Sequence, residues 1–199
     1  MVRTGIEPIR RDRSVRDIAE PIDREDLVLV QVFDQIAKAQ HDHLVGDEGQ
    51  GFALALSALD SGRLGIAACS TGLARAALET AATYARERRQ FGKPINEFQG
   101  IQFKLADMET RTAAARELLY KACAMADQNH PEKGKYSSMA KVFCSDVAMA
   151  VTVEAVQVLG GYGYVKEYPV ERMMRDAQIT QIYEGTNEIQ RLVIARTLK

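Results

Sequence analysis

The densest group of residues that could do chemistry lies near the C-terminus, in the run Tyr-Glu-Gly-Thr-Asn-Glu-Ile-Gln-Arg at 183–191. A lone carboxylate, Glu184, precedes Gly185, and a carboxylate held in a loop can serve as a general base. Thr186 suits the N-cap of a following helix, and Glu188 falls in its first turn, where the helix dipole favours an acid. Capping explains Thr186 and Glu188 and leaves Glu184 as either a solvated loop acid or a functional one.

Cysteine and histidine offer no comparable group. Cys69, Cys123 and Cys144 lie far apart without Cys-x-x-Cys spacing, which predicts neither a disulfide framework nor a zinc site and fits a reducing cytoplasm. His41 and His43 have no third ligand at metal spacing, so we expect no metal. The N-terminus has charges where a signal peptide needs an apolar run, and its acids argue against a mitochondrial transit peptide. These features predict a cytoplasmic protein.

Long helices must position these residues. Between breakers at Gly92, at 129–134 and at 160–163, apolar side chains recur every three or four residues, as in amphipathic helices. Three such helices with short connections pack as an antiparallel bundle. Phe143 is among the side chains expected to face inward. We therefore predict an all-α fold, an antiparallel four-helix bundle, with long helices at 63–90, 98–126 and 136–159, a weaker one at 51–59 continuing past Gly62, and short ones at 170–177 and 187–198.

Composition narrows the function classes. With 26 basic and 27 acidic side chains, the formal net charge is −1, which gives no electrostatic footprint for nucleic acid or an anionic membrane. A hydrophobic content of 46% in 199 residues is enough for a packed core. The best apolar run, 147–153, ends at Glu154 and is too short to span a membrane. We expect neither nucleic-acid binding nor membrane insertion.

Two stretches, read together, resemble the C-terminal helical domain of the acyl-CoA dehydrogenases. The first begins at Leu59 and reads LDSGRLGIAACSTGLARAALETAATYARERRQFGKPINEFQGIQFKLADM. The second begins at Gln157 and reads QVLGGYGYVKEYPVERMMRDAQITQIYEGTNEIQRLVIAR. Their order and spacing are those of the family, and the resemblance covers about three quarters of the chain, from about His43 to Lys199.

The resemblance implies a reaction, the FAD-dependent α,β-dehydrogenation of an acyl-CoA thioester to the trans-2-enoyl-CoA, as in fatty-acid β-oxidation. Family members remove the Cα proton with a carboxylate, and the matching residue here is Glu184, whose own N–H would help to hold the thioester carbonyl. Asp60, Arg63 and Gly185 match positions beside the substrate, although Asp60 also suits the N-cap of a helix beginning near Arg63. Some members carry the base at the position of Gly62 instead, which leaves Glu184 as the candidate.

The resemblance also implies positions that contact FAD. Arg88 resembles a residue that faces the pyrophosphate of the FAD of a neighbouring subunit, a task that suits its planar fork of donors. Taken alone, Gly160 and Gly161 are more typical of a helix C-cap than of a cofactor loop, and Tyr162 and Tyr164 are more typical of core or wall aromatics than of a site. The other matching positions are Gln90 and Phe91 in the same turn, Gln99, Gln157, Gly160 and Gly161 towards the adenosine, and Thr186 and Glu188 beside the flavin of the same subunit.

The implied partners are an acyl-CoA substrate, the electron-transferring flavoprotein as electron acceptor, and further copies of the chain in a homotetramer or dimer. Family members are roughly twice this long, with a helical and a β-domain before the bundle. Residues 1–42 are expected to be a poorly ordered extension or a β-domain remnant, in which the run 27–33 has strand-like composition, and 43–199 the bundle domain. Two hypotheses follow: a dehydrogenase or its catalytic part, and a non-catalytic helical oligomerisation module.

Overall fold

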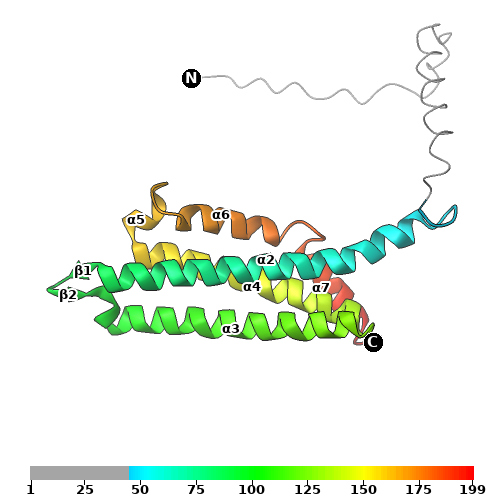
Figure 1. Cartoon of the computed structure of the whole chain (residues 1–199), viewed down its shortest axis with the longest axis horizontal. Coiled ribbons are helices and arrows are strands. Elements are labelled where there is room, and N and C mark those ends of the chain that lie inside the picture. Colours follow the sequence, from blue (N-terminus) through cyan, green and yellow to red (C-terminus); the bar gives the residue numbers. More distant parts are fainter. Residues whose placement is uncertain (1–44) are drawn as a thin grey trace, which may run out of the picture. The chain divides into compact units, whose positions relative to one another are not determined.

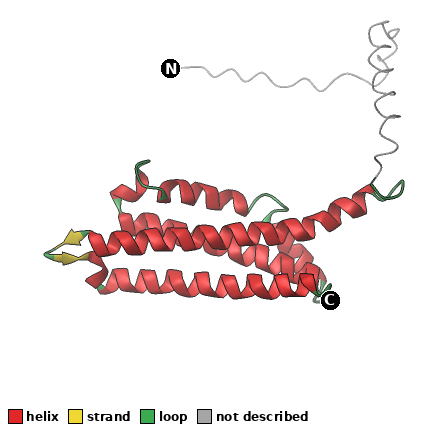
Figure 2. Cartoon of the chain, viewed as in Figure 1, coloured by secondary structure: helices red, strands yellow, loops and turns green. Residues whose placement is uncertain are grey.

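The computed structural model describes residues 45–199, and the chain divides at Gly51 into two compact units, of which Phe52–Lys199 contains the bundle. The strand-like run 27–33 and both N-terminal histidines lie outside the described residues. The described part is almost entirely helical, as Figure 2 shows, so the predicted all-α class is confirmed. Its elements are α2 (Gly51–Glu87), β1 (Arg89–Gln90), β2 (Lys93–Pro94), η2 (Ile95–Glu97), α3 (Gln99–Asp127), α4 (Lys133–Leu159), α5 (Gly161–Tyr164), α6 (Val170–Thr180) and α7 (Asn187–Arg196).

Three long helices form the body of the bundle, and α3 runs antiparallel to α2 and α4 (Figure 1). Their shared core is rich in alanine, which lets the helix backbones approach closely. On α2 the buried alanines recur at the three-to-four spacing of one helix face, at 67, 74, 77, 81 and 85. Larger side chains fill the space between them, with Met108 on α3 and Val151 on α4 nearly or wholly inaccessible to solvent.

The first helix differs from the prediction. We expected a helix at 51–59 that continues only weakly past Gly62, with the long helix beginning at Arg63, but α2 is one continuous helix from Gly51 to Glu87. Asp60 is therefore an interior residue of α2, and its alternative role as an N-cap is wrong. A single glycine such as Gly62 costs about 1 kcal/mol in a helix, which long flanking runs of good helix formers overcome. Continuity fixes the direction in which Gly62 faces relative to the buried alanines.

A second correction concerns Phe143, which we expected inside and which is 40% exposed. The buried face of α4 is filled by small side chains and by three serines and a lysine, and Phe143 lies at the edge of this face. By length and composition alone, α2 and α4 are also apolar enough to cross a membrane, contrary to the prediction. This is weak evidence for a span, because half of the apolar window of α4 is buried in the bundle.

A two-residue hairpin turns the chain from α2 into α3. β1 and β2 pair antiparallel, with Gln90 opposite Lys93, and Phe91 and Gly92 form the turn with φ of 51° and 82°. Positive φ at both positions is typical of the tight turns that suit two-residue hairpins. This hairpin was not predicted, although Gly92 was identified as a breaker.

The C-terminal segment folds back along α4. Both α6 and α7 pack on α4, and a loop at 181–186 joins them (Figure 1). Thr186 caps α7, accepting a hydrogen bond from the N–H of Ile189 at 3.4 Å, so its predicted capping role is confirmed. Gly160, with φ of 61°, ends α4 and confirms the predicted C-cap. Glu184 therefore stands in a short loop that both neighbouring helices anchor to the bundle.

Candidate active site

The loop at 181–186 has an unusual backbone at the candidate base. Glu184 has φ of 56° and Gly185 has φ of 84°, so two consecutive residues are left-handed. For a residue other than glycine this conformation carries strain of about 1–3 kcal/mol, and such residues cluster at functional sites. Gln190 holds the pair, because its Nε2 donates to the carbonyl oxygens of Glu184 and Gly185, both at 3.1 Å.

The carboxylate of Glu184 packs against Gly62 of α2. A methyl group built on Gly62 would lie 2.8 Å from Cδ of Glu184 and closer still to Oε2. A side chain at this position would therefore collide with the carboxylate, and glycine avoids the collision. Glu184 itself is half-buried. Positions 62 and 184, the two at which family members carry the base, are therefore in contact here, and the loop residue Glu184 provides the carboxylate.

The next residue along α2, Arg63, is 7% exposed and lies close enough to Lys141 for its positive charge to lower the pKa of that lysine. Asp60 lies less than one helical turn before Gly62 on the same helix. Gly185 lies directly after the base. The structure thus brings Arg63 and Gly185 to the neighbourhood of Glu184, and it places the backbone of Asp60 within one turn of this point.

Lys141 of α4 contacts the loop from the bundle core. This side chain is wholly buried, and its Nζ donates to the carbonyl oxygen of Gly185 at 2.9 Å and to Oδ1 of Asn187 at 2.8 Å. Burial lowers the pKa of Lys141 from 10.5 to about 8, and the negative charges of Asp146 and Glu188 limit the fall.

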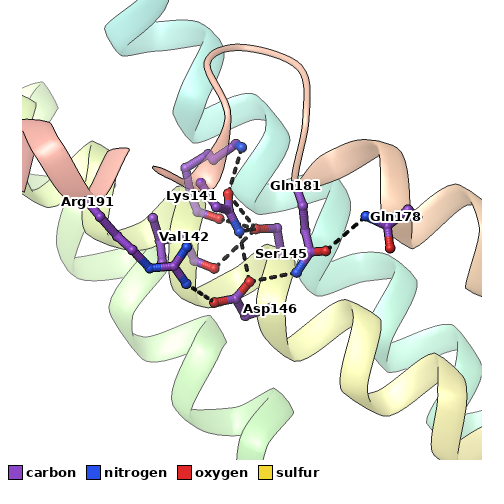
Figure 3. A network of polar contacts seen from close by, with 8 residues as sticks. Lys141, Val142, Ser145, Asp146, Gln178, Gln181 and Arg191 are labelled. Atoms are coloured by element: carbon purple, nitrogen blue, oxygen red, sulfur yellow. Dashed lines mark hydrogen bonds and ion pairs between the residues drawn. The ribbon is translucent and has the colours of Figure 1, made fainter. Parts of the chain in front are cut away.

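Asp146, one turn further along α4, collects the remaining polar contacts, which Figure 3 shows. Its carboxylate accepts from the side chains of Gln181 at 2.7 Å, Asn187 at 2.8 Å and Arg191 at 2.8 Å. The N–H of Asn187 also donates to the carbonyl oxygen of Gln181 at 3.0 Å, which closes the loop. The loop is therefore bound to α4 at both of its ends.

Sequence reasoning missed this network. A lysine and an aspartate are rarely buried or half-buried in an apolar helix without partners, and Lys141 stands in an apolar stretch between Met139 and Phe143. That signal could have identified Lys141. Its partners lie more than forty residues further along the chain, and no local pattern connects them.

Most of the other predicted positions lie at the far end of the bundle. A cavity of about 820 Å³ beside the hairpin is lined by Arg88, Gln90, Gly160 and Gly161, with Tyr84, Tyr162 and Tyr168 among its other wall residues. The Arg88 guanidinium lies over the ring of Tyr162, 5.5 Å from its centroid. Tyr162 is thus a wall aromatic, as one of the predicted alternatives had it.

Three predicted positions stand apart from this cavity. Phe91 is 92% exposed at the hairpin tip and packs edge-on against Phe98, with ring centroids 6.1 Å apart. Gln99 and Gln157 are exposed near the same end of the bundle, and neither lines the cavity. Tyr164 is also exposed and not part of the core.

The two groups of predicted residues occupy separate ends of the molecule. From Gly62 to the end of α2 at Glu87 the helix runs for about 38 Å at 1.5 Å per residue. Thr186 and Glu188 lie beside the candidate base, and hydrogen bonds from the backbone of Glu188 and from the Thr186 side chain lower the pKa of Glu188. Arg88 and its neighbours lie at the other end. One chain thus presents two separate groups of predicted site residues, its two candidate half-sites.

Residues 49–199 match the family model for the C-terminal domain of acyl-CoA dehydrogenase. The chain belongs to the acyl-CoA dehydrogenase family. It is 54% identical over 167 residues to the acyl-CoA dehydrogenase of Bacillus subtilis, covering 84% of this chain and 44% of that protein. The family resemblance inferred from the sequence is therefore confirmed.

Solved structures are also similar to this chain. The butyryl-CoA dehydrogenase of Megasphaera elsdenii superposes with a TM-score of 0.75 at 54% identity, over 77% of this chain and 40% of that one. The structure of PigA with FAD and proline matches with a TM-score of 0.74 at 32% identity, over 77% and 40%. This chain spans less than half of the length of the relatives it matches.

Proposed function

We propose that this chain supplies the base-bearing part of an FAD-dependent acyl-CoA dehydrogenase, which oxidises a short- or medium-chain acyl-CoA to its trans-2-enoyl-CoA. The observation that carries the proposal is the Glu184 carboxylate, which a left-handed loop presents against Gly62. A solvated loop acid needs no such support, whereas here Gln190 and Lys141 hold the backbone on either side. The strained, anchored backbone favours a functional role for Glu184.

The described residues fit FAD at both ends of the bundle. In the hairpin-end cavity the tyrosine rings offer flat surfaces to an adenine, and Arg88 offers paired donors to phosphate. An added Cβ at Gly160 or Gly161 would meet nothing within 4 Å, so this wall stands open to a ligand. At the base end, Thr186 and Glu188 would face the flavin. When bound, FAD supplies the acceptor for the hydride that leaves Cβ of the substrate.

Glu184 would take the proton from Cα of the acyl group. Its backbone N–H would donate to the thioester carbonyl and stabilise the negative charge that develops there, as donors preorganised for a transition state do. Gly62 keeps the space beside the carboxylate free of any side chain, and Arg63 adds positive charge close by. This chain would thus hold and move one proton at the Glu184 carboxylate.

Two half-sites at opposite ends of one chain support self-association, because a partner copy would complete each of them. We propose a homotetramer or dimer in which Arg88, Gln90 and Phe91 reach the FAD held by the neighbouring subunit, with Gln99 and Gln157 beside them. The electron-transferring flavoprotein would reoxidise the flavin, and we place the protein in the cytoplasm. Large apolar side chains exposed on the bundle, such as Phe103 and Phe143, favour such an assembly.

The proposal is tested by incubating the purified chain with FAD, desalting it, and recording its visible absorption. Retained flavin that is bleached anaerobically by butyryl-CoA supports the dehydrogenase. Glu184→Gln should then retain flavin and lose the bleaching. A stable oligomer without flavin contradicts the proposal and favours a non-catalytic oligomerisation module.

A further inference from the structure

Within the loop that carries Glu184, one carbonyl group accepts two buried side-chain donors. The oxygen of Gly185 accepts from Lys141 Nζ at 2.9 Å and from Gln190 Nε2 at 3.1 Å, so two donors occupy both of its lone pairs. One donor comes from α4 and the other from α7. They approach the same peptide group from two elements that pack against each other.

Both donors are fully buried, and both are specific to this backbone. Gln190 bridges two successive carbonyl oxygens, those of Glu184 and Gly185, and a methyl group on Gly185 would lie 2.6 Å from its Nε2. Lys141 adds a second contact to Asn187, which itself donates to Asp146 and to Ser145 at 2.9 Å. A charged donor to a carbonyl contributes more than a neutral one, especially where water is excluded.

A buried lysine costs free energy, and alanine fills much of the rest of this core. Packing alone therefore does not account for Lys141. Among residues 45–199, Lys141 forms no ion pair with a carboxylate, and its hydrogen bonds run to the loop and to the first residue of α7. These contacts fix the position of the Gly185 backbone. They do not involve the Glu184 carboxylate, which packs against Gly62. The effect of Lys141 on the base is therefore one of geometry.

We infer that Lys141 and Gln190 form a clamp on the Gly185 carbonyl and act as positioning residues, holding Glu184 in its left-handed conformation and its carboxylate at Gly62. The inference rests on the proposed role of Glu184 as the base. A loosened clamp lets the 184–185 pair relax to ordinary φ values, which moves the carboxylate away from Gly62. Misplacement by about 1 Å can cost about a hundredfold in rate.

Backbone hydrogen exchange of the full chain tests the clamp without any turnover. Lys141→Met keeps most of the length of the side chain and removes its donors. The matched control is Lys135→Met on the same helix, which breaks an ion pair with Glu132 and a contact with the Tyr136 ring near the helix start. We expect amide exchange in the segment 181–188 to accelerate about tenfold or more in Lys141→Met, with α3 changing less than about twofold. The control should match the wild type throughout.

A second variant covers the case in which Lys141→Met fails to fold. Gln190→Met removes the two hydrogen bonds of Nε2 together with Oε1, a buried atom that has no hydrogen-bond partner among the described residues, so the loss of Oε1 offsets part of the cost to folding. The same acceleration in 181–188 supports the clamp. Unchanged exchange in this segment overturns the clamp, because the two side chains then do not hold the loop. Equal acceleration in α3 also overturns it, because the two side chains then stabilise the whole bundle.

Kinetics separate the clamp from the proposed function. Where the chain turns over acyl-CoA, both variants should lower kcat about 10- to 100-fold at an unchanged KM, and substrate deuterated at Cα should show a larger isotope effect. A fall in kcat/KM that comes from KM alone contradicts positioning. A wild type that binds no flavin refutes the proposed function, and the exchange experiment still decides the clamp.

Discussion

Glu184 adopts a backbone conformation that few residues other than glycine take, and its neighbours compensate for the cost. The carboxylate then packs against Gly62, where any larger residue would collide with it. At the residue scale the candidate site therefore depends on two local properties, a strained φ at Glu184 and the absence of a side chain at Gly62. Each can be changed separately, and each change has a different expected effect.

Glu184→Gln removes the proton acceptor and preserves the shape of the side chain. We expect turnover of acyl-CoA to fall by at least about a hundredfold, the contribution typical of a general base, while flavin content stays near the wild-type value. Steady-state kinetics and the visible spectrum measure the two quantities. Unchanged turnover would falsify the assignment of Glu184 as the base.

Gly62→Ala should separate activity from stability. The new methyl group would collide with the Glu184 carboxylate, so activity should fall at least tenfold. Alanine in place of glycine within a helix favours folding by up to about 1 kcal/mol, so the thermal midpoint should not fall. The control is Gly65→Ala, one turn further along α2, where an added methyl group meets nothing within 4 Å. Equal activity in both variants contradicts the contact.

Lys141 should make stability depend on pH in a defined window. Its pKa is about 8 in the folded chain and near 10.5 when exposed, so below pH 8 both states carry the proton. Between about pH 8 and 10.5 the unfolded chain keeps a proton that the folded chain has released. The free energy of unfolding therefore rises with pH, by at most about 1.4 kcal/mol per pH unit from this group.

Urea denaturation of the wild type and of Lys141→Met at pH 7.5 and 9.5 checks this window. The wild type should gain stability relative to the variant at the higher pH, since other titrating groups are common to both proteins. A difference that stays constant between the two pH values means that the lysine keeps its ordinary pKa.

At the element scale, α2 and the hairpin carry the predicted positions to the two ends of the bundle, and α5 closes one of them. α5 packs closely against the end of α4 at Gly163. A methyl group on Gly163 would lie 2.6 Å from the carbonyl oxygen of Val156 and 2.9 Å from its Cα. Because both contacts are with backbone atoms of a helix, neither can move cheaply.

Gly163→Ala should therefore destabilise the fold by about 1–3 kcal/mol, the usual cost of overpacking. The matched control is Gly161→Ala in the same short helix, where the methyl group has open space. Equilibrium urea denaturation gives both values. Equal stability of the two variants would show that α5 can shift away from α4 without cost.

At the scale of the whole molecule, the two half-sites stand too far apart to serve the same point of one ligand, so flavin binding should depend on assembly. Arg88→Met should lower the flavin retained after desalting by several-fold, because paired donors to phosphate are lost. The control is Arg86→Met, an exposed arginine that contacts Thr83 near the end of α2. Flavin absorption per chain and sedimentation at several protein concentrations measure the effect. Retention that is independent of concentration contradicts a shared site.

The sequence by itself determined what depends on neighbours along the chain. Apolar spacing located the helices, Thr186 and Gly160 marked helix ends, and the two stretches from Leu59 and from Gln157 together identified the family and made Glu184 its candidate base. Hydrophobic periodicity and capping are local, so they can be predicted from a short window of residues. The same locality explains the error at Asp60, where a plausible cap lies inside a longer helix.

Only the tertiary structure decided how distant residues meet. The approach of Glu184 to Gly62, the buried Lys141 below the loop, and the separation of the two half-sites depend on helices packing against one another. A glycine within a helix or a lysine within an apolar run has no meaning until the opposing side chain is known. Long-range packing, and not local propensity, therefore gives these residues their roles.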